Sequence, residues 1–348
     1  MVSLVGDLPR AARNVWALSF GDGIEPYAPT PSTVVYDEPH RCLRRFDRAE
    51  PSAHRPVLLV PPLAVTPACF DLRDGQSFVR FLLDTGRQPY VIDYGEMTYA
   101  DRDLGLEEWT HDIVPTAIRR VSQEHDGAAV EVIGWSLGGI LAVLAGAGHA
   151  DLPIASITAI APPFDQRDTL TVAPLRLLGA VTGGREVDLA TRVFGGIPSY
   201  IVRTGFRVQA FQRELTRPLF VARNILDEDA LARMEAIDRF MAMMPGYPGR
   251  LYRQIHRSFI LRNELVTGTI RLRSDLVVET AKLTCPVLIL GSRTDLVVPA
   301  AAARAGQDVL TGAAEVRFEE VPGGHLGILA GPTARETTWR VIDEFLSR

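Results

Sequence analysis

The chain has 348 residues, of which 47% are hydrophobic and 23% are charged, an ordinary balance for a globular protein. A chain of this length buries roughly 75% of the surface that its unfolded form exposes, so it needs neither disulfides nor a metal to fold. There are 37 basic and 42 acidic residues, which gives a net charge of −5, and no basic block marks a nucleic-acid footprint. The composition excludes a disordered or fibrous chain and argues against a nucleic-acid partner.

The cysteines and the apolar segments predict a cytoplasmic protein without a membrane span. The three cysteines are odd in number and form no disulfide framework, so we expect reduced thiols at Cys42, Cys69 and Cys285. Residues 1–20 mix charged with apolar side chains and contain no secretory signal core. The longest almost uncharged stretch, residues 132–148, is short for a membrane span and interrupted by glycines.

Arginine dominates the basic residues, because Lys282 is the only lysine among the 37. We interpret this bias as a property of the coding sequence. The alternative is that some arginines recognise phosphate or carboxylate groups, which a planar guanidinium binds through two parallel hydrogen bonds.

The N-terminal region is expected to lack helices. Residues 1–30 show weak periodicity and several glycines and prolines, which predicts an irregular N-terminal arm. The short runs Ser32–Tyr36 and Cys42–Phe46 flank Glu38-Pro39 and predict a hairpin.

After the hairpin, short apolar runs alternate with helical patterns. Strands are expected at residues 56–60, 89–92, 128–134 and 154–161, and helices at 76–85, 106–124 and 137–148. From about residue 164 to 282 the pattern is helical and rich in arginine. The alternation then resumes, with strands expected at 286–291 and 316–321 and helices at 299–309 and 333–346.

Fully apolar strands that alternate with helices predict an α/β fold, with a mostly parallel central sheet and helices on both faces. A loop of about 120 residues without structure is implausible, so a large helical cap is expected before the last two core strands. The predicted domains are an N-terminal arm with the first part of the core at 1–163, the cap at 164–282 and the second part of the core at 283–348.

A nucleophile motif follows the strand expected at 128–134. The sequence GWSLG, centred on Ser136, has the form G-x-S-x-G between a strand and a helix. This setting holds a serine on a strained turn above the sheet, and side chains two positions before and after it would collide. We predict that Ser136 is a nucleophile; the alternative is a glycine-rich helix start with a capping serine.

Ser136 needs a general base, because a serine hydroxyl is scarcely ionised at pH 7. His325 lies in a glycine-containing loop between the last expected strand and the last expected helix, and it is the predicted base. The other histidines have weaker positions: His40, His54, His111, His125, His149 and His256.

Asp295 follows the strand expected at 286–291 and is predicted to orient the imidazole of His325, with Asp165 as the reserve candidate. The order serine, aspartate, histidine along the chain is the order of the triad in α/β-hydrolases.

Two backbone N–H groups are predicted to stabilise an oxyanion. One belongs to Leu137 at the start of the helix that follows the nucleophile. The other should follow the first core strand, where Pro61 and Pro62 have no N–H, so it belongs to Leu63 or Ala64, and we prefer Leu63. No metal-ligand spacing and no P-loop ending occur, so no metal or cofactor is expected.

With these residues the chain resembles the α/β-hydrolase superfamily, and within it the catalytic domain of polyhydroxyalkanoate synthases. The resemblance covers roughly residues 57–347. It is carried by VPPL at 60–63, SFVRFL at 77–82, MPG at 244–246, LY at 251–252, NEL at 263–265, Asp295 with VP at 298–299, and GH at 324–325. The synthases carry cysteine where this chain has Ser136. The resemblance implies acyl transfer through an acyl-enzyme, with acyl-CoA as one candidate donor.

Three hypotheses follow. The first is a serine hydrolase that cleaves an acyl ester or thioester, and the second is an acyltransferase that passes the acyl group to a hydroxyl acceptor. The third is a non-catalytic binding scaffold on the same fold. An apolar stripe in the cap either covers the acyl chain or simply packs: Phe240, Met241, Met243, Met244 and Tyr247. A homodimer is an open alternative to a monomer.

Overall fold

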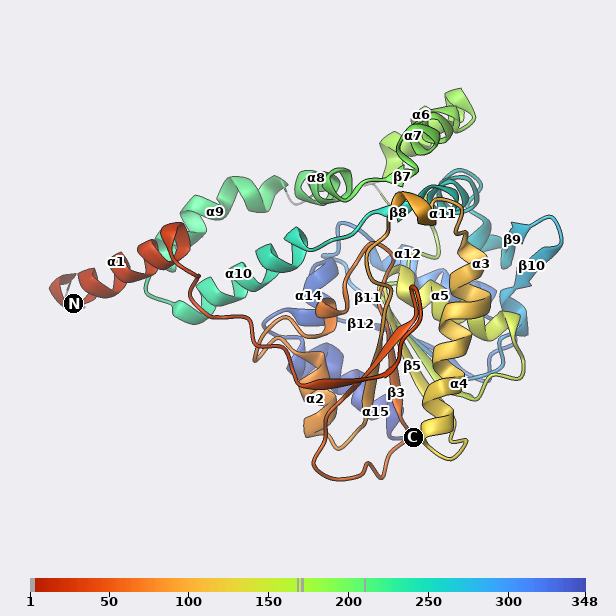
Figure 1. Ribbon diagram of the computed structural model, residues 1–348, viewed down its shortest axis with the longest axis horizontal. Coiled ribbons are helices and arrows are strands. Elements are labelled where there is room, and N and C mark those ends of the chain that lie inside the picture. The colour runs from red at the N-terminus through yellow and green to blue at the C-terminus, as the bar shows by residue number, and fades with distance from the viewer. Residues whose placement is uncertain (1–3, 168, 170–171, 210) are drawn as a thin grey trace.

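The structure, a computed structural model, describes residues 4–167, 169, 172–209 and 211–348. Within these residues, eight strands form a central sheet in the order β1-β2-β4-β3-β5-β6-β11-β12 (Figure 1). The strands are β1 (Ser32–Tyr36), β2 (Cys42–Phe46), β3 (Val57–Val60), β4 (Pro89–Asp93), β5 (Val130–Trp135), β6 (Ile154–Ile160), β11 (Val287–Gly291) and β12 (Val316–Glu320). Neighbours from β4 to β12 are parallel, whereas the β1–β2 hairpin joins the sheet antiparallel to β4.

Helices cover both faces of the sheet, as Figure 1 shows. The core helices are α2 (Phe78–Asp84), α3 (Leu106–Glu108), α4 (Val114–Glu124), α5 (Leu137–Gly148), α12 (Ala300–Arg304), α13 (Gly306–Val309), α14 (His325–Ala330) and α15 (Arg340–Leu346). The predicted mostly parallel α/β sheet is confirmed.

Successive strand residues point to opposite faces, so the sheet separates two apolar cores. Leu58 and Val60 of β3 pack in the core that contains α4 and α5, whereas Val57 and Leu59 pack in the core that contains α2 and α15. Burying each such side chain contributes about 1.5–3 kcal/mol, so the sheet is a firm platform for the loops at its edge.

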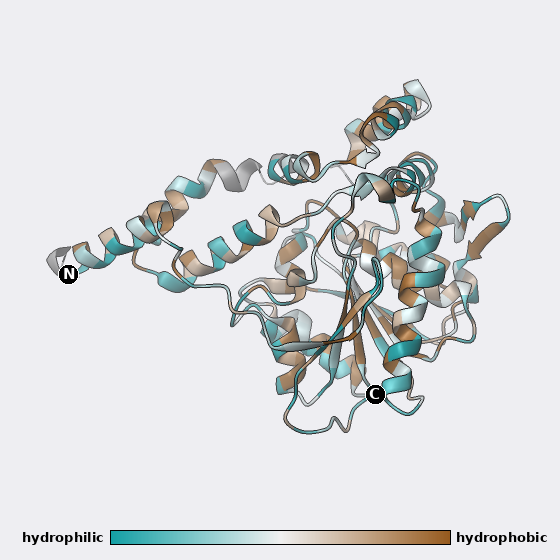
Figure 2. Cartoon of the chain, in the orientation of Figure 1, coloured by the Kyte–Doolittle hydropathy of each residue, from teal (hydrophilic) through white to brown (hydrophobic). Residues whose placement is uncertain are grey.

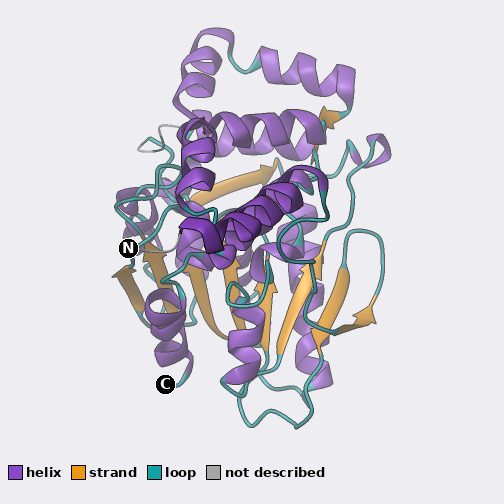
Figure 3. Ribbon diagram, turned by 90° about the vertical axis from the view of Figure 1, so that its left-hand side faces the viewer, coloured by secondary structure: helices purple, strands orange, loops and turns teal. Residues whose placement is uncertain are grey.

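The predicted helical cap lies between β6 and β11, before the last two core strands. It contains α6 (Ala173–Thr182), α7 (Arg185–Phe194), α8 (Ser199–Gln209), α9 (Phe211–Arg223), α10 (Glu228–Ala242) and α11 (Gly249–Gln254). A π-helical segment, η5 (Ile255–Leu261), continues α11. Figure 1 shows α8, α9 and α10 reaching well beyond the edge of the sheet, and in Figure 3 helices lie above the strands of the sheet. The domain boundaries at 163/164 and 282/283 stay a prediction.

The cap also contains strands that the sequence analysis did not predict. Strands β9 (Thr269–Arg273) and β10 (Leu276–Glu279) form an antiparallel hairpin, and β7 (Gly196–Ile197) pairs with β8 (Tyr247–Pro248). Burial alternates along β9, with its second and fourth residues buried. This alternation is the period-2 pattern of a strand with one covered face.

The prediction of an irregular N-terminal arm is wrong, because α1 (Leu4–Phe20) is a helix of 17 residues. It lies beside the cap rather than the sheet (Figure 1). Arg10 and Arg13 form ion pairs with Glu228 of α10, and the Asn14 side chain donates a hydrogen bond to the Ile225 carbonyl over 2.8 Å. These contacts between distant segments stabilise a helix whose internal proline and weak periodicity pointed to a loop.

None of the described helices is both long and apolar enough to cross a lipid bilayer.

Candidate active site

Ser136 lies on a strained turn between β5 and α5. Its φ of 53° and ψ of −123° lie outside the conformations that side-chain-bearing residues favour. A Cβ added to Gly134 would lie 2.4 Å from the Gly138 backbone, and one added to Gly138 would lie 2.1 Å from the Val60 carbonyl oxygen. Both glycines are therefore needed for the backbone to turn this sharply and to hold the Ser136 side chain above the sheet.

The structure brings together Ser136, His325 and Asp295, which are the three residues of the predicted triad. The Ser136 Oγ lies 3.0 Å from His325 Nε2, and His325 Nδ1 lies 2.7 Å from Asp295 Oδ2. A carboxylate accepts from Nδ1–H, which leaves Nε2 of the neutral imidazole to accept the Ser136 hydroxyl proton. The three side chains follow β5, β11 and β12, and they meet because parallel strands end at the same edge of a sheet.

The Asp295 carboxylate is held from two sides. Asp295 is only 1% exposed, and its Oδ1 accepts hydrogen bonds from the backbone N–H groups of Val297 and Val298 over 2.8 and 2.9 Å. Its other oxygen faces His325. The two backbone N–H groups hold the carboxylate in place, so that its other oxygen fixes the orientation of the imidazole.

Trp135 supports His325 from the nucleophile strand. Its indole Nε1–H donates to the His325 backbone carbonyl over 3.2 Å, and the two ring centroids lie 5.2 Å apart. The sequence analysis did not assign this role to Trp135. Its place directly before Ser136, at the end of a buried strand, was the available signal.

Asp165, the reserve candidate for the acid, does not contact His325. Its carboxylate accepts hydrogen bonds from Arg167 and from the Asn263 side chain. Burial raises the pKa of Asp165, but these hydrogen bonds outweigh that effect and leave the pKa below its usual value. All three residues lie between β6 and β11, so these interactions join the start of the cap to a segment near its end.

The two predicted oxyanion donors lie beside Ser136 in one cavity, which Leu63 and Leu137 both line. Leu137 is the first residue of α5, so its N–H has no partner within the helix. Tyr94 fixes the other segment, because its buried hydroxyl donates to the Pro61 carbonyl over 3.0 Å. Ala64, the other candidate, has a positive φ of 56°.

The cavity above Ser136 has a volume of about 450 Å³ and is mostly apolar. Core and cap both contribute to it. Apolar lining residues include Val172, Leu175, Ile201, Val202, Phe206, Ile255 and Ile260 from the cap, and Val297 and Val298 from the core. Such a cavity can hold a hydrophobic chain with its carbonyl end at the serine.

Two of the five residues of the predicted apolar stripe line the cavity, and the other three do not. Met244 and Tyr247 line the cavity. Phe240 is buried and its ring lies 6.4 Å from that of Trp135, whereas Met241 packs against the core and Met243 is exposed. The cavity instead takes Ile201, Val202 and Phe206 from α8, which the sequence analysis did not single out.

No cysteine in the described residues supplies an activated thiol. All three cysteines are free, and burial raises the pKa of each thiol, in the case of Cys285 to about 12. A thiol with a raised pKa is protonated at neutral pH and a poor nucleophile. Among the described residues, no cluster of histidine, cysteine or carboxylate side chains is arranged to hold a metal.

Comparisons with known proteins agree with this architecture. No family model matches the chain. It is 27% identical over 322 residues to the poly(3-hydroxyalkanoate) polymerase subunit PhaC of Allochromatium vinosum, covering 91% of this chain and 88% of that protein. The polymerase subunit of Synechocystis sp. is 28% identical over 314 residues, covering 88% of this chain and 82% of that protein.

Solved structures show the same fold at low sequence identity. A hydrolase from Pseudomonas aeruginosa matches with a TM-score of 0.54 and 16% identity, covering 91% of this chain and 98% of that one. MenH from S. aureus matches with a TM-score of 0.51 and 12% identity, covering 88% and 97%. The chain is thus an enzyme with the α/β-hydrolase fold, and its sequence resembles those of the polyhydroxyalkanoate synthases.

Proposed function

We propose that this protein is a serine hydrolase that cleaves an ester or thioester of a hydrophobic acyl group. The observation that carries the proposal is the continuous chain of hydrogen bonds from Ser136 through His325 to Asp295 at the base of an apolar cavity. This arrangement is the one that activates a serine in unrelated hydrolases.

In the first step the Ser136 Oγ attacks the acyl carbonyl carbon while its proton moves to His325 Nε2. Asp295 keeps the imidazole in the required orientation and stabilises its positive charge. The negative oxygen of the tetrahedral intermediate accepts hydrogen bonds from the N–H groups of Leu137 and Leu63. When the intermediate collapses, the leaving alcohol or thiol takes the proton from Nε2, and an acyl-serine remains.

In the second step water attacks the acyl-serine. His325 accepts a proton from this water and returns it to the Ser136 Oγ, which releases the free acid. The apolar cavity supports an acyl chain as the bound group, since each buried CH₂ contributes about 0.8 kcal/mol.

A second candidate is an acyltransferase, favoured by the similarity to PhaC polymerase subunits over 91% of the chain. In this case a hydroxyl acceptor replaces water in the second step, and acyl-CoA is a candidate donor. Chemistry up to the acyl-serine is identical, so the two functions differ only in the acceptor.

An active-site probe tests the shared mechanism. A fluorophosphonate should label the wild-type protein and fail to label Ser136→Ala, with Ser52→Ala, a serine remote from the cavity, as the matched control. Absence of labelling in the folded wild-type protein would favour the non-catalytic scaffold. Incubation with acyl-CoA and hydroxyl acceptors then separates the candidates, because free acid indicates a hydrolase and a new ester an acyltransferase.

The proposal includes a homodimer in the cytoplasm. Large apolar side chains of α6 and α7 are exposed, among them Leu177, Val181, Leu189 and Val193, each at least 62% exposed. Figure 2 shows brown, hydrophobic segments on these helices. Patches of this kind mark contact surfaces. Light scattering after size-exclusion chromatography tests the dimer, and the three free thiols support a reducing compartment.

A further inference from the structure

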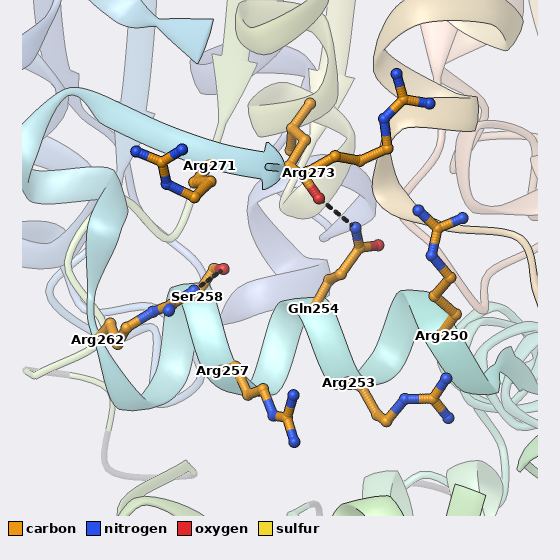
Figure 4. Close-up of a pocket in the computed structure, with 9 residues that line it drawn as sticks. Arg250, Arg253, Gln254, Arg257, Ser258, Arg262, Arg271 and Arg273 are labelled. Atoms are coloured by element: carbon orange, nitrogen blue, oxygen red, sulfur yellow. Dashed lines mark hydrogen bonds between the residues drawn. The ribbon is translucent and has the colours of Figure 1, made fainter. Parts of the chain in front are cut away.

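The cavity above Ser136 is called the acyl cavity below, and the helix formed by α11 and η5 makes one of its walls. A second recess, of about 290 Å³, lies on the other side of this helix. Figure 4 shows the side chains that line it, from α11, η5 and β9. They are Arg250, Arg253, Gln254, Arg257, Ser258, Arg262, Arg271, Leu272 and Arg273. Six arginines thus surround one hollow, although the sequence contains no basic block.

Helical spacing explains how one helix serves two cavities. Arg250, Arg253 and Arg257 are spaced at i, i+3 and i+7 and share a face of the helix. Tyr252 and Ile255 lie on the opposite face and line the acyl cavity. The arginine recess is therefore separated from the acyl cavity by the width of the helix, about 10 Å with its side chains.

The recess keeps an excess of positive charge. None of its lining residues is acidic. Four of the six arginines form ion pairs with carboxylates outside the lining: Arg250 with Glu107, Arg257 with Asp188, Arg262 with Glu264, and Arg273 with Asp275. Six positive charges thus face four negative ones in a protein whose net charge is −5.

Arg253 and Arg271 are the two that no carboxylate of the described residues neutralises. Arg253 donates to the Thr191 hydroxyl over 2.9 Å, and Arg271 donates to the Ser274 carbonyl over 3.4 Å. Both partners are neutral, so each guanidinium keeps its charge and further donors free. Arg253 and Arg257 also line an adjoining recess, to which α7 contributes Arg192 and Asp188, the carboxylate already paired with Arg257.

Charge and shape together define the ligand. Several guanidinium groups around one hollow can bind phosphate oxygens through charge-assisted, two-pronged hydrogen bonds. The single apolar lining residue is Leu272, and no aromatic ring lines the hollow for a base to stack on. We propose that this recess binds an anion with two or more phosphate groups and recognises the phosphates themselves.

Two sources share this chemistry: the phosphate groups of a coenzyme A thioester, and a separate phosphate-rich anion such as inorganic pyrophosphate. Only the first source rests on the proposed function. Calorimetric titration of the full chain with pyrophosphate at low ionic strength tests the recess without any need for catalysis. We expect saturable binding that weakens as salt is added, because the contacts are ionic.

The variant R253Q/R271Q should weaken pyrophosphate binding at least about tenfold, since each lost hydrogen bond to a charged group costs that order of affinity. R253K/R271K keeps both positive charges but lacks the planar guanidinium groups, so its affinity for pyrophosphate should lie between those of R253Q/R271Q and the wild type. R119Q/R348Q is the matched control, because it removes two exposed arginines that form ion pairs elsewhere. Thermal melts confirm that each variant is folded.

Two results would overturn the proposal: wild-type protein that does not bind pyrophosphate, or an equal loss of binding in R253Q/R271Q and R119Q/R348Q. Where binding is lost only in the recess variant, the ratio of KM for acyl-CoA to KM for a p-nitrophenyl ester identifies the source. A ratio that rises in R253Q/R271Q assigns the phosphates to coenzyme A. An unchanged ratio assigns the recess to a separate anion.

Discussion

The surroundings of the triad in the sheet core and the outer helices of the cap differ in how closely their side chains are packed and paired. In the core, Asp295 is buried, yet both of its oxygens accept hydrogen bonds. In the cap, Leu177 and Val181 of α6 are largely exposed. Buried polar atoms without a hydrogen-bond partner among the described residues occur in both regions, for example both ring nitrogens of His256 in the cap and Thr158 Oγ1 in the core. The surroundings of the triad thus fix a few atoms in place, whereas the outer helices of the cap leave apolar side chains exposed.

Replacing Asp295, the buried acid of the core, should have the largest effect on activity. Asp295→Asn should lower kcat about 10⁴-fold, because the amide cannot hold the imidazole in the tautomer that accepts the serine proton. Asp165→Asn is the matched control, since Asp165 contacts Arg167 and Asn263 rather than His325. Turnover of a p-nitrophenyl ester measures both variants. Equal losses in the two would contradict the assignment of Asp295.

The second-largest effect is expected where a side chain is added to the tightly packed backbone of the core. In Gly138→Ala the new methyl carbon would lie only 2.1 Å from the Val60 carbonyl oxygen. We expect a loss of about 3 kcal/mol in the free energy of unfolding, measured by urea denaturation, because a packed interior cannot make room. The control is Gly205→Ala in α8 of the cap, where no atom lies within 4 Å of the new methyl group. That variant should be as stable as wild type or slightly more so.

The same contrast explains what the sequence could predict. Short apolar strands and the GWSLG turn predict the core and the turn that carries Ser136, the proposed nucleophile, because local pattern and final burial agree there. His325 and Asp295 could be placed because both follow core strands. Helix α1 was missed because its contacts with the cap, among them the ion pairs of Arg10 and Arg13 with Glu228, join segments more than 200 residues apart.

The arginine recess could be predicted only in part. The spacing of Arg250, Arg253 and Arg257 is visible in the sequence as one helical stripe. That Arg271 and Arg273 meet this stripe depends on how the β9–β10 hairpin packs against α11, which no local pattern encodes. Contacts between segments that are distant in the sequence therefore determine which arginines line the recess.

A bulky residue in the cap should change specificity rather than chemistry. Val202 of α8 is buried and lines the acyl cavity, so Val202→Trp fills space meant for the acyl chain. We expect kcat/KM to fall roughly tenfold for long-chain p-nitrophenyl esters and much less for the acetate, since each excluded CH₂ forfeits about 0.8 kcal/mol. Val193→Trp, on an exposed face of α7, is the control. A uniform loss across chain lengths would remove Val202 from the substrate site.

The smallest expected effect concerns His256, which joins η5 to the turn between α6 and α7. Its imidazole is buried against Gly179 and Gly184, and its Nε2 lies 3.7 Å from Glu186. Burial lowers the pKa of His256, and Glu186 only partly offsets this. The folded protein therefore keeps the ring neutral at a pH where the unfolded chain, with a pKa of about 6.5, takes up a proton.

It follows that this group costs stability as the pH falls below about 6.5, by up to about 1.4 kcal/mol per pH unit. His111, His125 and His149 have pKa values lowered by burial and act in the same direction. His256→Leu should therefore raise stability at pH 8 by about 1 kcal/mol, by removing two unpaired polar atoms, and make the acid slope shallower without abolishing it. Urea denaturation between pH 5 and 8 measures both effects, with exposed His54→Leu as the control. An unchanged slope in His256→Leu would mean that the cap opens around this ring before it is protonated, and that the junction of η5 with α6 and α7 is looser than its burial indicates.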